Sequence, residues 1–411
     1  MSVFPLTENS IMKKARFIVP LFFVFAVLFG ALILTGPVQA QEEAQEEAPD
    51  EEVSVDFLKE MAEAGDAASQ YLLGCRYVQG DGVEQDWTKA IECFQKSAEQ
   101  GFAAAQSILS VCYYNGEGVE QNHAEALKWA RLGAEQGEAD AQNILGSCYE
   151  EGDGVEQDLK QAVEWYRKAV EQNCPEAQNN LGTCYLEGIG VERDPSKAVE
   201  LFRKAADQGD ALAQFNLGIC YDEGIGIKQD SSLAVGWYQV AAEQDCAQAQ
   251  YNLGVCFEEG EGVEQNYAEA VKWYQKGAEQ GYALAQNNLG SCYYLGKGVP
   301  QNYAEAFKWF RKSADQGCPE AQNSLGACYF NGFGVKKDIG KAKEWFQKAA
   351  DLGNDDAKKN LINCRKKQMN DFRTLLVQLV IGVAFIVAAV RKFFGKKKAE
   401  NPSPDQNGTA V

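Results

Sequence analysis

Residues 174–209 read CPEAQNNLGTCYLEGIGVERDPSKAVELFRKAADQG, and this stretch is the unit from which most of the chain is built. Its Leu-Gly pair recurs every 36 residues, at Leu145, Leu181, Leu217, Leu253, Leu289 and Leu325. A fixed period of this length is typical of stacked structural repeats. We therefore expect one elongated core made of contacts between neighbouring repeats.

Each unit predicts two helices joined by a glycine loop. The first helix carries apolar and small residues at helical spacing, as at Ala177, Leu181 and Tyr185, and the second carries Ala and aromatic residues. Between them a Gly-x-Gly-Val/Ile loop suits a helix end at positive φ, and no strand or P-loop lysine supports phosphate binding. The residue four positions after the second Gly is expected to cap the second helix, and it is Asp86, Asn122, Asp158, Asp194, Asp230, Asn266, Asn302 and Asp338.

The end of each unit also predicts a helix cap. This position is Gly in all units except those that end at Asn173 and Asp245. Asn and Asp are the other residues that tolerate a left-handed backbone, so the exceptions support the same cap.

The predicted fold class is all-α, an α-solenoid of eight 36-residue helix-loop-helix repeats with capping helices and a C-terminal transmembrane helix. The expected segments are a signal peptide or signal anchor (1–40), an acidic disordered linker (41–53), an N-terminal capping helix (54–65), the eight repeats (66–353), a C-terminal capping helix (354–370), a transmembrane helix (373–391) and a basic disordered tail (392–411).

Two apolar runs predict a membrane location. Residues 17–34 follow a basic cluster and precede small residues, as in a secretory signal, and their length also permits an uncleaved anchor. Residues 374–390 are apolar except for Gln378 and have basic flanks. We expect a bacterial inner-membrane protein with a periplasmic solenoid and a cytoplasmic C-terminus, single-pass if the first run is cleaved and two-pass if it is not.

The charge is distributed unevenly. The whole chain has a formal net charge of −20. Residues 41–357 have a net charge of −30, and the basic segments at the two ends of the chain offset part of it. An acidic body argues against nucleic-acid binding, which needs a basic surface.

Few residues suit catalysis or metal binding. The only histidine, His123, stands where other repeats have Tyr267 and Tyr303, and we interpret it as a packing residue. No CxxC motif occurs among the 13 cysteines. We expect most of them to be buried free thiols. A disulfide from Cys93 to Cys75 or Cys112 is left open. The sequence predicts no catalytic residue, no cofactor and no metal site.

The consensus AQxxLGxxYxxGxGVxxDxxxAxxWxxKAAxxG, nearly complete in residues 321–353, resembles the Sel1-like repeat family, which is related to tetratricopeptide repeats. The resemblance covers about residues 66–367 and implies an α-solenoid that acts as a scaffold for protein partners.

Cysteine-rich Sel1-like proteins of Helicobacter are a second comparison, and they imply β-lactam binding or hydrolysis. Their paired-helix disulfides do not carry over, because only Cys93 lies on a second helix. The serine β-lactamase motifs S-D-N and K-T-G are absent from the sequence, and no S-x-x-K follows residue 40.

A candidate partner site lies on the first helices. By analogy with tetratricopeptide packing, positions two and five before and four to six after the Leu-Gly pair face a concave surface. Acidic residues there oppose the helix dipole, which suggests a role other than helix stability. The predicted partner-binding residues are Glu150, Glu151, Glu187, Phe215, Asp222, Glu223, Tyr251, Glu258 and Glu259.

The leading functional hypothesis is a non-enzymatic, membrane-tethered scaffold that recruits a protein or peptide, of basic charge, on this face. A β-lactamase-type hydrolase or penicillin-binding protein and a secreted adhesin or host-factor binder are the alternatives. The partner's identity and the oligomeric state are left open by the sequence.

Overall fold

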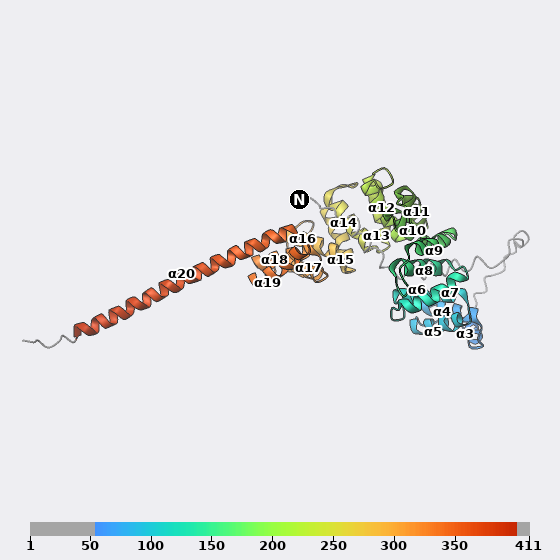
Figure 1. The fold of residues 1–411 in the computed structure, drawn as a ribbon, viewed down its shortest axis with the longest axis horizontal. Helices are drawn as coiled ribbons and strands as arrows, with labels where there is room; N and C mark the ends of the chain where they lie inside the picture. Colours follow the sequence, from blue (N-terminus) through green and yellow to red (C-terminus); the bar gives the residue numbers. More distant parts are fainter. Residues whose placement is uncertain (1–53, 401–411) are drawn as a thin grey trace, which may run out of the picture. The chain divides into compact units, whose positions relative to one another are not determined.

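The computed structural model describes residues 54–400, and the side chains of residues 54–390. The predicted signal segment and the acidic linker lie outside the described residues. Over the described range the chain forms helices and no strand, as the repeat pattern predicts (Figure 1). The chain divides into two compact units, unit 1 (Met1–Gln265) and unit 2 (Asn266–Val411).

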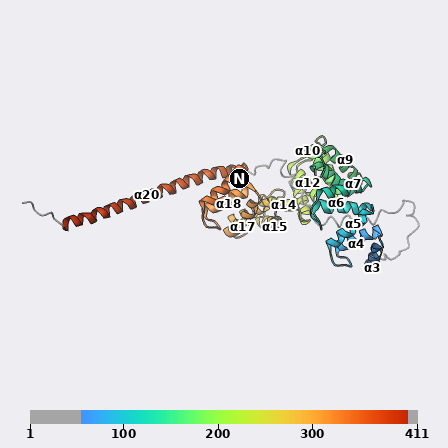
Figure 2. The same ribbon diagram turned by 60° about the horizontal axis from the view of Figure 1, so that its bottom comes forward.

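Unit 1 contains a short first helix and then alternating first and second helices of the repeats, which follow one another in chain order (Figure 2). Its helices are α3 (Val55–Glu63), α4 (Ala67–Gln79), α5 (Trp87–Glu99), α6 (Ala103–Asn115), α7 (His123–Glu135), α8 (Ala139–Glu151), α9 (Leu159–Glu171), α10 (Pro175–Glu187), α11 (Pro195–Asp207), α12 (Ala211–Glu223), α13 (Ser231–Glu243) and α14 (Ala247–Glu259).

Unit 2 continues the same alternation and ends in a long helix. Its helices are α15 (Tyr267–Glu279), α16 (Ala283–Leu295), α17 (Tyr303–Asp315), α18 (Pro319–Asn331), α19 (Ile339–Asp351) and α20 (Asp355–Glu400).

The loop between the paired helices has the backbone that its glycines predict. Gly188 ends α10 with φ 77°, and Gly190 follows with φ 67°. A Cβ added to Gly190 would lie 2.2 Å from the carbonyl oxygen of Leu159 in the preceding repeat, so glycine also permits a close contact between repeats. Asp194 then caps α11 by accepting a hydrogen bond from the Lys197 amide (3.1 Å), and the seven equivalent residues cap their own helices. The predicted caps are confirmed.

The two predicted left-handed residues are confirmed as well. Asn173 has φ 64° and Asp245 has φ 62°, and both follow the end of a second helix.

A small residue packed against an aromatic ring forms the centre of most repeats. In α10 the missing side chain of Gly182 makes room for Phe202 of α11, because an added Cβ would lie 2.7 Å from that ring. Phe202 is fully buried. Gly218 of α12 and Tyr238 of α13 repeat the arrangement. The recurring Leu-Gly pair is therefore a requirement of packing between the paired helices.

Buried glutamines join consecutive repeats. Gln214 of α12 donates to the carbonyl oxygen of Ala206 in the preceding repeat (3.2 Å) and accepts from Gln244 of its own repeat (2.8 Å). Its side chain is buried, so both bonds satisfy groups that have left water. The bond to the preceding carbonyl recurs from Gln106, Gln142, Gln250, Gln286 and Gln322.

The C-terminal segment differs from its predicted division. A capping helix, a separate transmembrane helix and a disordered tail were expected, yet α20 is continuous from Asp355 to Glu400. The expected break at residues 371–372 contains neither Gly nor Pro, so nothing in the local sequence ends the helix. Lys, Ala and Glu are strong helix formers, which accounts for helix where residues 392–400 were predicted to be disordered.

Candidate partner-binding site

The predicted site residues all lie in unit 1, on the first helices α8, α10, α12 and α14. They fall into three positions relative to the Leu-Gly pair, and these positions differ in exposure.

The last residue of each of these four helices is a glutamate. We call Glu151, Glu187, Glu223 and Glu259 the acidic row. Glu151, Glu223 and Glu259 are exposed and Glu187 is half-buried. The same position in the other first helices is uncharged, being Gln79, Asn115, Leu295 and Asn331. The acidic row is thus confined to four consecutive repeats.

The acidic residues one position earlier are less accessible. Glu150 is 6% exposed and accepts a hydrogen bond from the Tyr166 hydroxyl (2.8 Å). Asp222 is half-buried and accepts from the Tyr238 hydroxyl (3.3 Å), and burial raises the pKa of this carboxyl. Both carboxylates thus serve as acceptors for a buried tyrosine of the paired helix. Glu258, at the same position, is half-buried.

The two predicted aromatic anchors also differ in exposure. Phe215 is 1% exposed, and its ring centroid lies 6.0 Å from that of Tyr238. The expectation that Phe215 lies on the surface is therefore wrong, because its ring packs against Tyr238 of the paired helix. Tyr251, at the same position of the next repeat, is half-buried.

Successive first helices touch through asparagines. Asn180 donates to Asn143 of the preceding first helix (3.0 Å), and Asn216 donates to Asn179 (2.8 Å). These bonds join the central parts of α8, α10 and α12.

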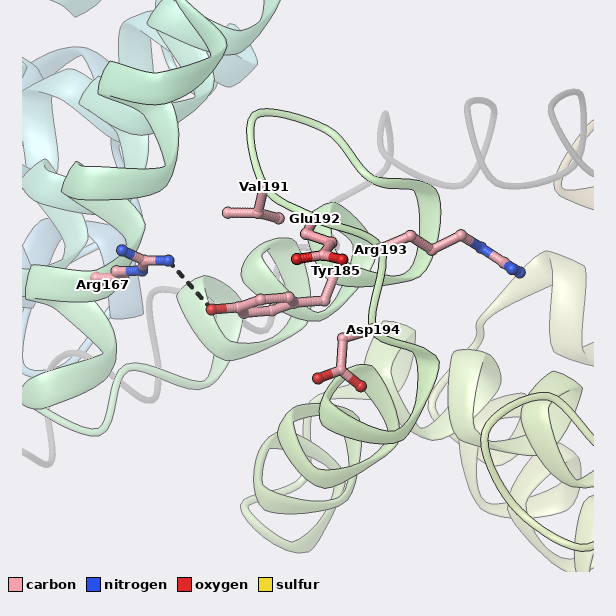
Figure 3. Close-up of a pocket in the computed structure, with 6 residues that line it drawn as sticks. All are labelled: Arg167, Tyr185, Val191, Glu192, Arg193 and Asp194. Atoms are coloured by element: carbon pink, nitrogen blue, oxygen red, sulfur yellow. Dashed lines mark hydrogen bonds between the residues drawn. The ribbon is translucent and has the colours of Figure 1, made fainter.

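A pocket of about 580 Å³ lies between the second helix of one repeat and the loop of the next (Figure 3). Arg167 donates to the Tyr185 hydroxyl across it (3.1 Å), whereas Arg193 points away from Arg167. The Arg193 Nε bonds the Leu186 carbonyl (2.8 Å), and Asp194 caps α11. Four of the six residues that line this pocket therefore have structural partners, and the charges of the lining are mixed.

The cysteines are free thiols. All 13 lie within the described residues, Cys93 is half-buried and the other 12 are buried. Burial raises the pKa of Cys148 and of Cys220 to about 12, so these thiols are poor nucleophiles at neutral pH. The prediction of buried free thiols is confirmed.

His123 packs as the sequence predicts. Its ring meets that of Tyr114 edge-on at 5.3 Å, as Tyr303 meets Tyr294 at 5.3 Å in unit 2. The His123 Nδ1 lies 3.3 Å from an Asp153 carboxylate oxygen.

Stacked helix pairs with caps, glycine loops and inter-repeat polar contacts define an α-solenoid of the tetratricopeptide-like class. A model of the Sel1 repeat matches residues 67–102, 103–138, 139–174, 175–210, 211–246, 247–282, 283–318 and 319–354. The chain belongs to the Sel1 repeat family. Members of this family are generally non-catalytic scaffolds that bind other proteins.

Two solved structures share the fold. One is c5321, a protective antigen of uropathogenic Escherichia coli, with 37% identity over 75% of this chain and 66% of that chain, and a TM-score of 0.57. The other is a Sel1 repeat protein of Oxalobacter formigenes, with 35% identity over 83% of this chain and 92% of that chain, and a TM-score of 0.52. A comparison with curated proteins finds no match.

Proposed function

We propose that this protein is a membrane-tethered scaffold that recruits a basic segment of a partner protein along the acidic row. The single observation that carries the proposal is that, among the first helices of the repeats, a terminal glutamate occurs only in α8, α10, α12 and α14. The general role of Sel1 repeats in protein binding supports it.

The position of these glutamates is unfavourable for the helices themselves. A carboxylate in the last turn opposes the helix dipole, at a cost of roughly 0.3–1 kcal/mol each. All eight second helices also end in Glu or Asp, so what distinguishes the acidic row is its restriction to four consecutive first helices. A basic partner would match this row, because complementary charge speeds association and excludes acidic competitors.

The spacing of the helices suggests the form of the partner. Helices in direct contact have axes about 8–10 Å apart. A chain in the extended polyproline II conformation advances about 3.1 Å per residue and returns to the same face after three residues. An extended peptide lying across α8, α10 and α12 would thus present a residue to successive glutamates about every third position. We expect a Lys or Arg at every third residue, with an apolar residue beside Tyr251.

The membrane tether is α20. It is the helix of the described chain that is long and apolar enough to cross a membrane, and its apolar side chains are exposed, as at Phe385 (73%). We propose a bacterial inner membrane with the solenoid in the periplasm and the basic end of α20 in the cytoplasm, because a secretory signal over residues 17–34 would export the repeats.

Charge reversal tests the site. Replacing Glu223, Glu258 and Glu259 by Lys should abolish capture of the partner from native membranes. A matched control replaces Glu164, Glu171 and Glu200, three exposed glutamates on the second helices α9 and α11, by Lys. Equal capture by both triple variants would refute the acidic row as the site.

A peptide series tests the recognition rule independently of the partner's identity. Peptides with Lys at every third position should bind more tightly than peptides of identical composition with the lysines in one block. The difference should shrink as salt is raised, because exposed charges are screened. Equal binding of the two arrangements would contradict the proposed register.

A further inference from the structure

Three potential metal ligands meet between the first helices α8 and α10, away from the acidic row. The carboxylate oxygens of Asp140 and Glu176 and the Sγ of Cys174 all lie within 4.8 Å of one another. Cys174 Sγ is 3.3 Å from Glu176 Oε2 and 3.9 Å from Asp140 Oδ1. Asp140 lies in the first turn of α8, and Cys174 and Glu176 lie at the start of α10, the first helix of the next repeat.

We propose that Asp140, Cys174 and Glu176 form a binding site for a divalent cation of the zinc class, which joins two consecutive repeats.

The separations fit tetrahedral coordination. With Zn–S near 2.3 Å and Zn–O near 2.1 Å, a tetrahedral site places sulfur and oxygen about 3.6 Å apart. The two observed separations, 3.3 and 3.9 Å, lie on either side of this value. A thiolate ligand favours Zn²⁺ over Mg²⁺ and Ca²⁺, which prefer oxygen, and the fourth position is left for water.

The direction of the Cys174 side chain is a second observation. Cys174 is the residue before α10, and at the same position Asp66 and Asp210 cap their helices through their side chains. Cys174 makes no such capping bond, and neither do Cys246 and Cys318 at their helices. It is 4% exposed, and the side-chain groups that its Sγ contacts are the two carboxylates. The thiol is therefore directed into the cluster.

The chain contains two matched comparisons. Cys246 occupies the same repeat position, but Gln248 replaces the Glu176 carboxylate and Leu212 replaces Asp140. Cys318 has Glu320 at 3.4 Å and Leu284 in place of Asp140. Cys174 is thus the only one of the three with both carboxylates, and Cys246 provides a control thiol of similar burial.

The experiment titrates reduced, metal-free full-length protein in detergent micelles with Co²⁺ and then displaces it with Zn²⁺. Wild type should bind one equivalent and develop a thiolate-to-Co²⁺ charge-transfer band. Cys174→Ser should lose the band, and Cys246→Ser should keep it. Asp140→Asn and Glu176→Gln keep the thiol, and each should weaken binding by roughly tenfold or more.

Absence of the band in wild type, its survival in Cys174→Ser or its equal loss in Cys246→Ser would each overturn the proposal. Circular dichroism monitors folding of every variant. If Cys174→Ser does not fold, the two carboxylate variants decide the test. Unchanged Co²⁺ affinity in both of them would also overturn the proposal.

Discussion

Some residues of the repeats depend on a partner in the paired helix. Glu150 accepts from the buried Tyr166, whereas the equivalent positions in the next repeat are Leu186 and Phe202, both buried and apolar. A buried hydroxyl needs an acceptor, and a phenyl ring does not. The acid in α8 is thus explained by packing, while Glu151 beside it is not.

This dependence predicts that a second substitution restores the stability that a first one removes. Tyr166→Phe should lower the free energy of unfolding by about 1–3 kcal/mol, because a buried carboxylate loses a donor. Adding Glu150→Leu should recover most of the loss by reproducing the Leu186–Phe202 pairing. Urea denaturation of the two single variants and the double variant measures the coupling, and additive effects would contradict the pairing.

Two helical glycines should respond to alanine in opposite ways. Gly182→Ala should destabilise the protein by about 1–3 kcal/mol, because the added methyl would meet the Phe202 ring at 2.7 Å. Gly236 in α13 is exposed, and an added Cβ would meet nothing within 4 Å, so Gly236→Ala should stabilise by up to about 1 kcal/mol. A shift of the same sign in both thermal midpoints would be inconsistent with this packing.

The sequence was sufficient for features that depend on neighbouring residues in the chain. The caps at Asp194 and its equivalents and the left-handed Asn173 were predictable because the backbone and the adjacent side chain determine them. The burial of Phe215 and Glu150 was not predictable in the same way, because it depends on Tyr238 and Tyr166 of the paired helix. The 16-residue separation between acid and tyrosine, shared by both Tyr–acid pairs, is the signal that could have identified Glu150 as structural.

At the scale of helices, the metal cluster was missed for a related reason. Asp140 and Cys174 are 34 residues apart, and only the stacking of α8 on α10 brings them together. A repeat period of 36 residues implies that such positions are neighbours, so the signal was a Cys with acids at equivalent positions of two consecutive repeats.

The same helix ends predict how stability varies with pH in metal-free protein. Glu176 and Asp140 have folded-state pKa values raised to about 8 and about 6, from usual values of 4.5 and 3.8. The folded state therefore holds more protons than the unfolded state in this window, and its stability should fall as pH rises from 5 to 8. Thermal unfolding in chelator should show this fall in wild type and a smaller one in Glu176→Gln. An equal fall in both proteins would contradict the assignment.

The length of α20 shows where helix ends are hard to predict. The composition changes from polar to apolar at residue 374. This change indicates where the surroundings of the chain change, but it does not require the helical backbone to end there. Without a Gly or Pro to stop it, one helix continues from the last repeat into the apolar run.

At the scale of the molecule, α20 should account for membrane retention. Leu379→Arg with Val383→Arg should release the protein from membranes in alkaline carbonate, since each Arg costs about 2.5–3.5 kcal/mol at a helix centre. Met369→Arg with Phe372→Arg, outside the apolar run, should leave it in the pellet. Retention of the first double variant would contradict α20 as the anchor.

The family relationship and the repeat architecture follow from the sequence because the same pattern occurs in eight repeats. The partner cannot be read from that pattern, since it is specified only where the repeats differ. The acidic row is such a difference, and its role in binding is the central claim.

The most direct measurement of that claim is site-specific photocrosslinking in native membranes. A photoreactive residue replaces Glu223 in one protein and the exposed Glu200 of α11 in another. We predict a crosslinked adduct to a basic segment from position 223, competed by the peptide with Lys at every third position, and none from position 200. An adduct of equal yield from both positions, or one that the peptide does not compete, would contradict it.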